Sequence, residues 1–287
     1  MDVSNETPRV RIPINYVGVE GIHIPFYTKI GGNKVNSILK IDAYIDLPAS
    51  QRGIHASRSL EAIQEVVLSY RERLMRIEDI VSHISRDLLT RHTYSRRSMA
   101  RAMGNIVINI KPWRDGPSSL ERIKIYGKAY GKRGEIDISI KKFVGVEVSG
   151  LTACPSAKRS THELLNDVDE EYSPTHMQRG YLDIVVEVSD EGGVDIVDLI
   201  YIAMNSFSAP TFELLKREHE ARLIIDAYKK PLFTEDVVRN AVKGLIELLG
   251  RDSRQVVWVR HRSMESIHSH NLVAKIYGKI SDLSKFL

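Results

Sequence analysis

The only cysteine in the chain, Cys154, ends an apolar stretch and directly precedes Pro155. Proline interrupts the hydrogen-bond ladder of a sheet, so Cys154 is expected at the end of a strand rather than within one. A single cysteine cannot form an internal disulfide, which leaves the thiol available for metal binding or nucleophilic chemistry. The alternative is a small buried apolar side chain, and the position alone does not decide between the two.

Histidines in two other clusters could share a metal with Cys154. His176 lies in SPTHMQRG, directly before a predicted strand, whereas the competing His162 lies in a charged helical segment that is typical of a solvated surface. His268 and His270 belong to MESIHSHN, and their spacing of two places both on one side of an extended segment. Thiolate and imidazole together suit Fe(II) or Zn(II), and three or four protein ligands leave a position for water. By spacing alone, either His268 or His270 is a candidate ligand.

A third polar cluster, DLPASQRGIHASRS, lies where a predicted strand ends and a predicted helix begins. Free backbone N–H groups at a helix start, together with Arg52, His55 and Arg58, favour a phosphate group. Ser57 or Ser59 is the expected N-cap of the helix. A capped surface turn is an equally good interpretation of the same residues.

Hydrophobic spacing predicts the elements that position these clusters. The predicted strands are residues 10–19, 37–47, 104–113, 121–131, 135–151, 180–189, 256–264 and 270–280. The predicted helices are residues 57–88, with a break or bend near 75–79, and residues 194–205, 213–228 and 234–249. Strands, two helices and strands follow one another twice, which indicates an α+β fold of two related units, residues 1–135 and 136–287, the second with most of the candidate ligands.

The composition is that of an ordinary globular protein. Of 287 residues, 43% are hydrophobic and 27% charged, and the net charge of +4 suits a polyanionic small molecule at least as well as nucleic acid. No stretch reaches the roughly 18 apolar residues of a membrane span, and no signal peptide is recognisable, so a cytoplasmic protein that binds no membrane is expected. The motifs of Rossmann and phosphate-loop nucleotide sites, GxGxxG and GxxxxGK[ST], are absent, as are HExxH and CxxC.

Seven stretches of the chain occur in the order found in one enzyme family: NYVGVEG, DLPASQRGIHASRS, VGVEVSGLTACPSA, THMQRG, SAPTFELLKREHEA, FTEDVVR and ESIHSH. Over nearly its full length, the chain resembles the metal-dependent tunnelling-fold GTP cyclohydrolases. These are the bacterial type I-B enzymes and especially the archaeal, type IV enzyme of methanopterin synthesis. Each stretch is weak by itself, but seven in register are highly specific.

The resemblance implies tandem tunnelling-fold units, antiparallel sheets each covered by a helix pair, in a homotetramer with active sites at subunit interfaces. It also implies that GTP is hydrolysed to a 7,8-dihydroneopterin cyclic phosphate, formate and pyrophosphate. The metal ligands carry over as Cys154, His176 and His268. The implied metal is Fe(II), with Zn(II) or Mn(II) as alternatives in purified protein.

Some positions depart from the family pattern. Ser156 stands where relatives have a second cysteine. Pro210 stands where relatives have a metal-linked glutamate, and Glu213 is the nearest carboxylate. The guanine-anchoring glutamate aligns with Ile225, which leaves Glu220 or Asp226 as substitutes.

The chemistry that follows is addition of water at C8 of guanine. A bound divalent metal lowers the pKa of its water from ~15.7 toward ~7, and His270 or His55 could carry the proton. The expected substrate contacts are Arg52, His55, Arg58, Gln178, Arg179 and Lys216, with Arg217 as a further candidate. Two other functions remain open: a thiol-nucleophile enzyme that uses Cys154, and a non-catalytic purine- or pterin-binding protein of the same fold.

Overall fold

The computed structural model describes residues 3–30, 32–70, 74–165, 167–189 and 194–287. By packing, the chain forms two compact units, Met1–Ile106 with Ile125–Val144 and Glu187–Gly193, and Val107–Lys124 with Gly145–Val186 and Val194–Leu287. The strands β3 (Arg97–Ile110), β4 (Ser119–Arg133), β5 (Ile138–Ala153) and β6 (Met177–Val188) contribute residues to both units.

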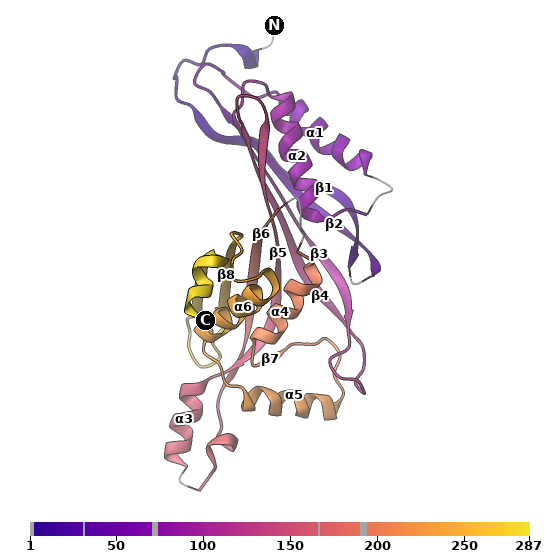
Figure 1. Cartoon of the computed structure of the whole chain (residues 1–287). Helices are drawn as coiled ribbons and strands as arrows, with labels where there is room; N and C mark the ends of the chain where they lie inside the picture. The colour runs from indigo at the N-terminus through magenta and orange to yellow at the C-terminus, as the bar shows by residue number, and fades with distance from the viewer. Residues whose placement is uncertain (1–2, 31, 71–73, 166, 190–193) are drawn as a thin grey trace. The chain divides into compact units, whose positions relative to one another are not determined.

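The first unit is an antiparallel sheet with two helices. Strand β1 (Ile14–Ile30) pairs with β2 (Asn33–Leu47), which pairs with β3. Helices α1 (Ala56–Ser69) and α2 (Ile77–Arg91) lie side by side (Figure 1). Alternate residues of β2 are fully buried, as are apolar residues of both helices, so this core lies between the sheet and the helix pair: Leu39, Ile41, Ala43, Ile45, Ile63, Val81 and Ile84.

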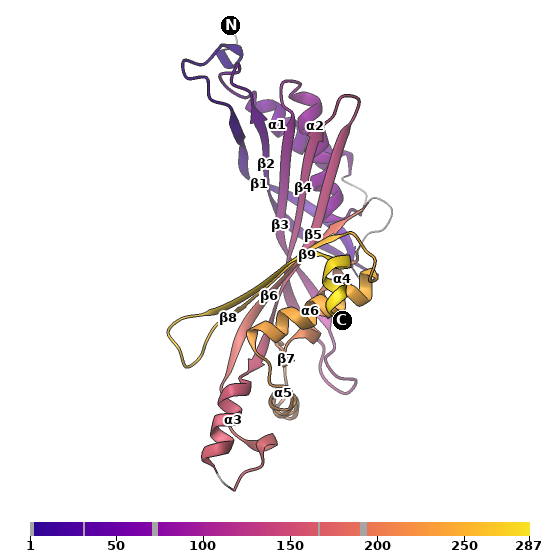
Figure 2. The ribbon, with the colours of Figure 1, turned by 60° about the vertical axis from the view of Figure 1, so that its left-hand side comes forward.

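The second unit repeats this arrangement. Strand β6 pairs antiparallel with β8 (Val256–Ser263), which pairs with β9 (Leu272–Lys279), and β5 lies beside β6. Helices α4 (Ile196–Ser206) and α6 (Thr234–Leu249) pack on each other and lie against these strands (Figure 2). The buried apolar face of α6, which includes Ala241 and Leu245, and the buried residues Val257 and Val259 of β8 form the core.

Further short elements belong to the second unit. Helix α3 (Pro155–Leu164) follows β5 directly, and α5 (Arg217–Lys229) stands between α4 and α6 in the chain. The two-residue strand β7 (Ala209–Pro210) pairs with β5. This unit also contains α7 (Ile280–Leu283) and the 3-10 helices η2 (Glu170–Tyr172) and η3 (Ser284–Phe286), whereas the 3-10 helix η1 (Val3–Asn5) belongs to the first unit. Among the described helices, none is both long and apolar enough to cross a membrane.

The predicted α+β class, antiparallel sheets each with a helix pair, is confirmed, and several boundaries are corrected. The first strand begins at Ile14 rather than residue 10 and continues to Ile30, because HIPFYTKI keeps the alternation of buried and exposed residues. The helical stretch is broken between Ser69 and Ile77, and residues 71–73 of the predicted helix lie outside the described residues. The division at residues 135 and 136 stays a prediction.

The predicted N-cap residues of α1 were wrong. His55 occupies the N-cap position, and Ser57 and Ser59 lie inside the helix. Ser59 is buried, and its hydroxyl lies 3.0 Å from Nε2 of His92. The start of α5 was also placed too early: it begins at Arg217 rather than at Glu213.

Candidate active site

Cys154 and His176 are joined through their backbones at neighbouring strand ends. Strand β5 ends at Ala153, α3 begins at Pro155, and Cys154 between them is the N-cap of the helix. Its backbone N–H donates to the carbonyl oxygen of His176 at 3.1 Å, and the Thr175 hydroxyl donates to the carbonyl oxygen of Cys154 at 2.7 Å. The half-buried Cys154 Sγ accepts the N–H of Ala157 at 3.4 Å. The structure therefore brings these two predicted ligands together.

The imidazole of His176 faces polar groups from two directions. Its Nδ1 lies 2.8 Å from Gln178 Oε1 and 3.2 Å from Ser266 Oγ. The Gln178 amide nitrogen donates to Thr152 Oγ1 at 3.1 Å. Gln178 is 8% exposed and Thr152 is 1% exposed, so this chain of contacts runs through the protein interior. Arg179, the next predicted substrate contact, is exposed.

His268 and His270 lie in the exposed loop between β8 and β9. Their rings stack, with centroids 5.1 Å apart and planes at 13°. The same loop carries Ser266, which contacts His176. The competing His162 lies on α3, with Nδ1 2.8 Å from the Val168 carbonyl oxygen.

Two of the predicted metal ligands have the chemistry and placement that a metal site requires. The Cys154 thiol is half-buried at a strand end, and the contacts of His176 use Nδ1, which leaves Nε2 for a ligand bond. Within the described ranges, however, no three His, Cys, Asp or Glu residues are gathered so as to hold a metal ion. Cys154 and His176 are thus the fitting half of the predicted set, and His268 is not gathered with them.

The segment that carries the remaining carboxylate candidates is held by two buried residues. The backbone N–H of Glu213 donates to Glu121 Oε1 at 2.9 Å, and that of Leu214 donates to Ser119 Oγ at 3.0 Å. The Glu213 side chain itself is exposed. These contacts fix the backbone of residues 213 and 214 ahead of α5, which begins at Arg217.

Helix α5 is also fixed to the strand ends that carry the candidate ligands. The Tyr228 hydroxyl donates to the Thr175 carbonyl oxygen at 3.0 Å. The predicted substrate residues Lys216, Glu220 and Asp226 are exposed, Lys216 as the N-cap of α5 and the other two along it. They are therefore accessible, but no contact joins them to Cys154 or His176.

The predicted phosphate residues lie in the first unit at the start of α1. Arg52 forms an ion pair with the Glu6 carboxylate, and its backbone N–H donates to the Glu6 carbonyl oxygen at 2.9 Å. His55 Nε2 lies 3.1 Å from Asn5 Oδ1. Arg58 is exposed and donates to the Arg91 carbonyl oxygen at 3.4 Å. A segment near the N-terminus thus contacts two of the three predicted phosphate residues.

The start of α1 is electrostatically positive. Behind it, the fully buried His92 contacts Ser59 and lies 2.9 Å from the Tyr94 hydroxyl. Burial, first of all, and the nearby groups Arg58, His55 and Arg91 together lower the pKa of His92 to about 4. The same charges that disfavour a protonated His92 would favour a bound anion.

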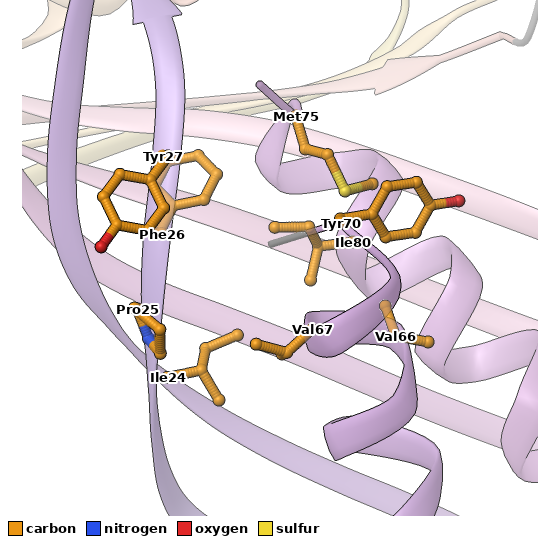
Figure 3. Close-up of a pocket in the computed structure, with 9 residues that line it drawn as sticks. All are labelled: Ile24, Pro25, Phe26, Tyr27, Val66, Val67, Tyr70, Met75 and Ile80. Atoms are coloured by element: carbon orange, nitrogen blue, oxygen red, sulfur yellow. The ribbon is translucent and has the colours of Figure 1, made fainter. Parts of the chain in front are cut away.

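A pocket in the first unit has the wrong chemistry for a polyanion. It lies between β1 and the two helices and is lined by Ile24, Pro25, Phe26, Tyr27, Val66, Val67, Tyr70, Met75 and Ile80 (Figure 3). The lining is almost wholly apolar, and the Tyr70 hydroxyl points away from it toward His83, 3.2 Å distant. The pocket offers no group that would bind phosphate.

The sequence interpretation missed Thr152, Ser266 and Glu6. Thr152 precedes Cys154 by two residues and Gln178 follows His176 by two, so each pair shares a strand face. That spacing could have indicated the contact between Thr152 and Gln178. Nothing in the spacing of Glu6 and Arg52, 46 residues apart, indicates theirs.

Comparison with known proteins identifies the family. Residues 1–274 match the family described as "Type I GTP cyclohydrolase folE2". The chain is 34% identical over 307 residues to GTP cyclohydrolase MptA of Methanosphaera stadtmanae, covering 99% of this chain and 97% of the relative. It is 32% identical over 288 residues to GTP cyclohydrolase MptA of Aeropyrum pernix, with the same coverages. The chain belongs to the type I GTP cyclohydrolase family.

Similar solved structures support the fold. The uricase from Arthrobacter globiformis aligns with a TM-score of 0.60 over 95% of this chain and 96% of its own, at 8% sequence identity. A uricase from Bacillus fastidious aligns with a TM-score of 0.55 over 94% of this chain and 95% of its own, also at 8% identity. The predicted tunnelling fold is therefore confirmed, and at this identity the likeness concerns the fold alone.

Proposed function

We propose that the chain is a metal-dependent GTP cyclohydrolase that converts GTP to a 7,8-dihydroneopterin cyclic phosphate, formate and pyrophosphate, the first step of methanopterin-type pterin synthesis. The family match and the relatives named GTP cyclohydrolase MptA support the reaction class. The observation that carries the site is the backbone bond between Cys154 and His176, which fixes a thiol and an imidazole at adjacent strand ends. Assignment to the archaeal, type IV branch rests on the relatives named GTP cyclohydrolase MptA and not on the geometry of Cys154 and His176.

Cys154 and His176 would hold the metal, Fe(II) in the first instance, with His268 and Glu213 completing the set. When bound, a divalent metal lowers the pKa of its water from ~15.7 toward ~7, which supplies a nucleophile for C8 of guanine at neutral pH. His268 lies on the loop whose Ser266 contacts His176, which supports its place in the proposed set. We propose that the site lies at a subunit interface of a homotetramer.

The chain's own residues bind the substrate and move protons. Arg52 and Arg58 would hold the triphosphate at the start of α1, where backbone N–H groups also favour an anion. Holding the α-phosphate in place aligns it for attack by a ribose hydroxyl, which gives pyrophosphate and the cyclic ester. His270 or His55 would carry the proton as formate leaves, because the pKa of histidine is near neutral. Glu220 or Asp226 would accept the guanine edge, with Arg179 and Lys216 as further contacts.

The decisive experiment supplies GTP and Fe(II) to anaerobically purified protein and measures formate, pyrophosphate and the pterin product. Release of formate with pyrophosphate supports the full proposal, whereas formate with a retained triphosphate limits it to the ring-opening reaction. Metal-loaded protein that binds GTP and releases no formate would contradict the cyclohydrolase function. Covalent labelling of Cys154 by substrate would instead indicate the thiol-nucleophile reaction.

A further inference from the structure

Gln178 approaches His176 from inside the protein. The two residues are separated by one position on the sequence, and Gln178 Oε1 lies 2.8 Å from Nδ1 of the imidazole. On its other side, the Gln178 amide nitrogen donates to Thr152 Oγ1, 3.1 Å away on β5. Because Gln178 is 8% exposed and Thr152 is 1% exposed, both ends of the amide are used within the protein.

We propose that Gln178 is a positioning residue that holds His176 in the tautomer with hydrogen on Nδ1, and that Thr152 supports the Gln178 amide by accepting from its nitrogen. This assignment differs from the substrate contact expected of Gln178 from the sequence, which stays a prediction. This positioning role depends on the proposed function only because it assumes that Nε2 of His176 binds a metal. The tautomer of His176 can be measured whether or not a metal binds.

The chemistry of the contact decides which nitrogen carries the hydrogen. A neutral imidazole has one N–H and one lone pair, and an amide carbonyl oxygen can only accept. Nδ1 must therefore donate to Gln178 Oε1, and the Ser266 hydroxyl oxygen at 3.2 Å can accept the same hydrogen. The lone pair then lies on Nε2, away from both contacts. Histidines that bind metals commonly fix their second N–H on an oxygen in this way.

Thr152 accepts the hydrogen bond of the amide nitrogen in the orientation that the structure shows. With the Gln178 nitrogen donating to Thr152 Oγ1, the carbonyl oxygen is turned toward His176. Rotation of the amide by half a turn would present an N–H to Nδ1, which would then have to accept, and the hydrogen of the ring would move to Nε2. Such a ring could not bind a metal through Nε2. The direction of one buried amide thus decides whether His176 is a competent ligand.

The first test is the tautomer in metal-free protein. Nitrogen NMR of protein labelled at histidine, recorded at a pH where His176 is neutral and assigned with His176→Asn, reports which ring nitrogen carries hydrogen. The Nδ1–H form is expected in the wild type and in Thr152→Ser, and a mixture of tautomers in Gln178→Leu and Thr152→Val. A wild-type ring with hydrogen on Nε2 would overturn the inference.

The second test is metal affinity, with Zn(II) as the probe. Gln178→Leu is expected to weaken binding ~10–100-fold, as is typical when the partner of a ligating histidine is removed. Gln178→Glu and Thr152→Ser keep an acceptor for Nδ1 and a hydroxyl for the amide, so both should bind nearly as well as wild type. Gln64→Leu removes an exposed amide on α1 and is the matched control.

The two tests separate the inference from the proposed function. If Gln178→Leu binds Zn(II) as tightly as wild type while folding normally by circular dichroism, the positioning role is wrong. If wild type binds no metal but shows the Nδ1–H tautomer that Gln178→Leu loses, the inference stands and the metal-dependent function does not. The pair Thr152→Val and Thr152→Ser keeps the test decisive should Gln178→Leu fail to fold.

Discussion

The backbone N–H of Cys154 donates to the carbonyl oxygen of His176 over 3.1 Å, where β5 has just ended and β6 is about to begin. This bond and the neighbouring strands fix the backbones of the two residues side by side. The thiol also serves the fold, since Sγ accepts the N–H of Ala157 as the N-cap of α3. Cys154 therefore has a structural role in addition to the metal-binding role proposed for it.

Substitutions of Cys154 can separate these two roles. Cys154→Ser is expected to keep the helix cap, because serine is a favoured N-cap residue, and to lose bound metal, because a hydroxyl stays protonated at neutral pH. Cys154→Ala should lose the metal and also ~0.5–2 kcal/mol of stability through the missing cap. Metal content after anaerobic purification and urea unfolding check both outcomes. Stoichiometric metal in Cys154→Ser would show that the ligand is misassigned.

Glu6 competes with a polyanion for Arg52. The carboxylate pairs with the guanidinium, so a phosphate can take its place only if the pair opens. Exposed pairs of this kind are worth ~0.2–1 kcal/mol, which corresponds to a roughly 1.5–5-fold tighter binding of inorganic triphosphate by Glu6→Gln. Isothermal titration calorimetry measures the change. Glu247→Gln, which removes an exposed carboxylate paired with Lys243, is the control and should bind like wild type.

The outcome for Glu6→Gln is informative together with Arg52→Ala. Loss of triphosphate binding in Arg52→Ala, with no gain in Glu6→Gln, would show that the Glu6 contact does not compete. Unchanged binding in Arg52→Ala would instead remove Arg52 from the phosphate site.

The sequence predicted those parts of the site that depend on short-range order. The apolar run before Cys154 and Pro155 after it place the thiol at a strand end, and the strand after His176 does the same for the imidazole. Alternation and helical spacing likewise predicted the sheets and helix pairs. These patterns are local, because burial on one face of a strand or helix leaves a mark every second or every third to fourth residue.

The parts that could not be predicted depend on contacts between distant segments. The substrate contact expected of Gln178 stays a prediction, whereas its hydrogen bond to Thr152 joins residues 26 positions apart on two strands. The backbone contact of Glu213 with Glu121 joins residues 92 positions apart. Such pairings leave no periodic signal in a single sequence.

Gly180, from the THMQRG stretch, makes room for a buried aromatic pair. A Cβ at this position would lie 2.1 Å from Nε2 of His261, a ring that is fully buried and packed edge-on against Phe207 at 5.4 Å. Gly180→Ala is therefore expected to lower the free energy of unfolding by ~1–3 kcal/mol, the usual cost of overpacking. Urea denaturation measures it.

Gly53→Ala is the control for Gly180→Ala. Its Cβ would meet only Ser4 atoms at 3.7–3.8 Å, an ordinary contact. Its stability should change by less than about 0.5 kcal/mol, as for most surface substitutions. Equal effects of the two substitutions would refute the steric explanation.

The buried Glu78 at the start of α2 should make stability depend on pH. Its pKa is raised from 4.5 to about 7, mainly by burial and also by the charge of Asp79, against the lowering effects of its own backbone N–H, Arg76 and Lys142. A raised carboxyl pKa means that the folded state binds the proton more tightly than the unfolded state. Stability is therefore full below pH 4.5 and falls as the pH rises through about 7.

The isosteric variant Glu78→Gln cannot ionise and should lack this loss. A shift of this size corresponds to a difference on the order of 3 kcal/mol between the two pH limits. The free energy of unfolding of the variant, relative to wild type, is thus expected to rise between pH 5 and pH 8 and then to level off. Urea denaturation across that range measures this difference in the free energy of unfolding. The buried histidines contribute equally to the pH dependence of both proteins, so their contributions cancel in the difference. Parallel stability curves for wild type and Glu78→Gln would show that Glu78 does not carry the proton.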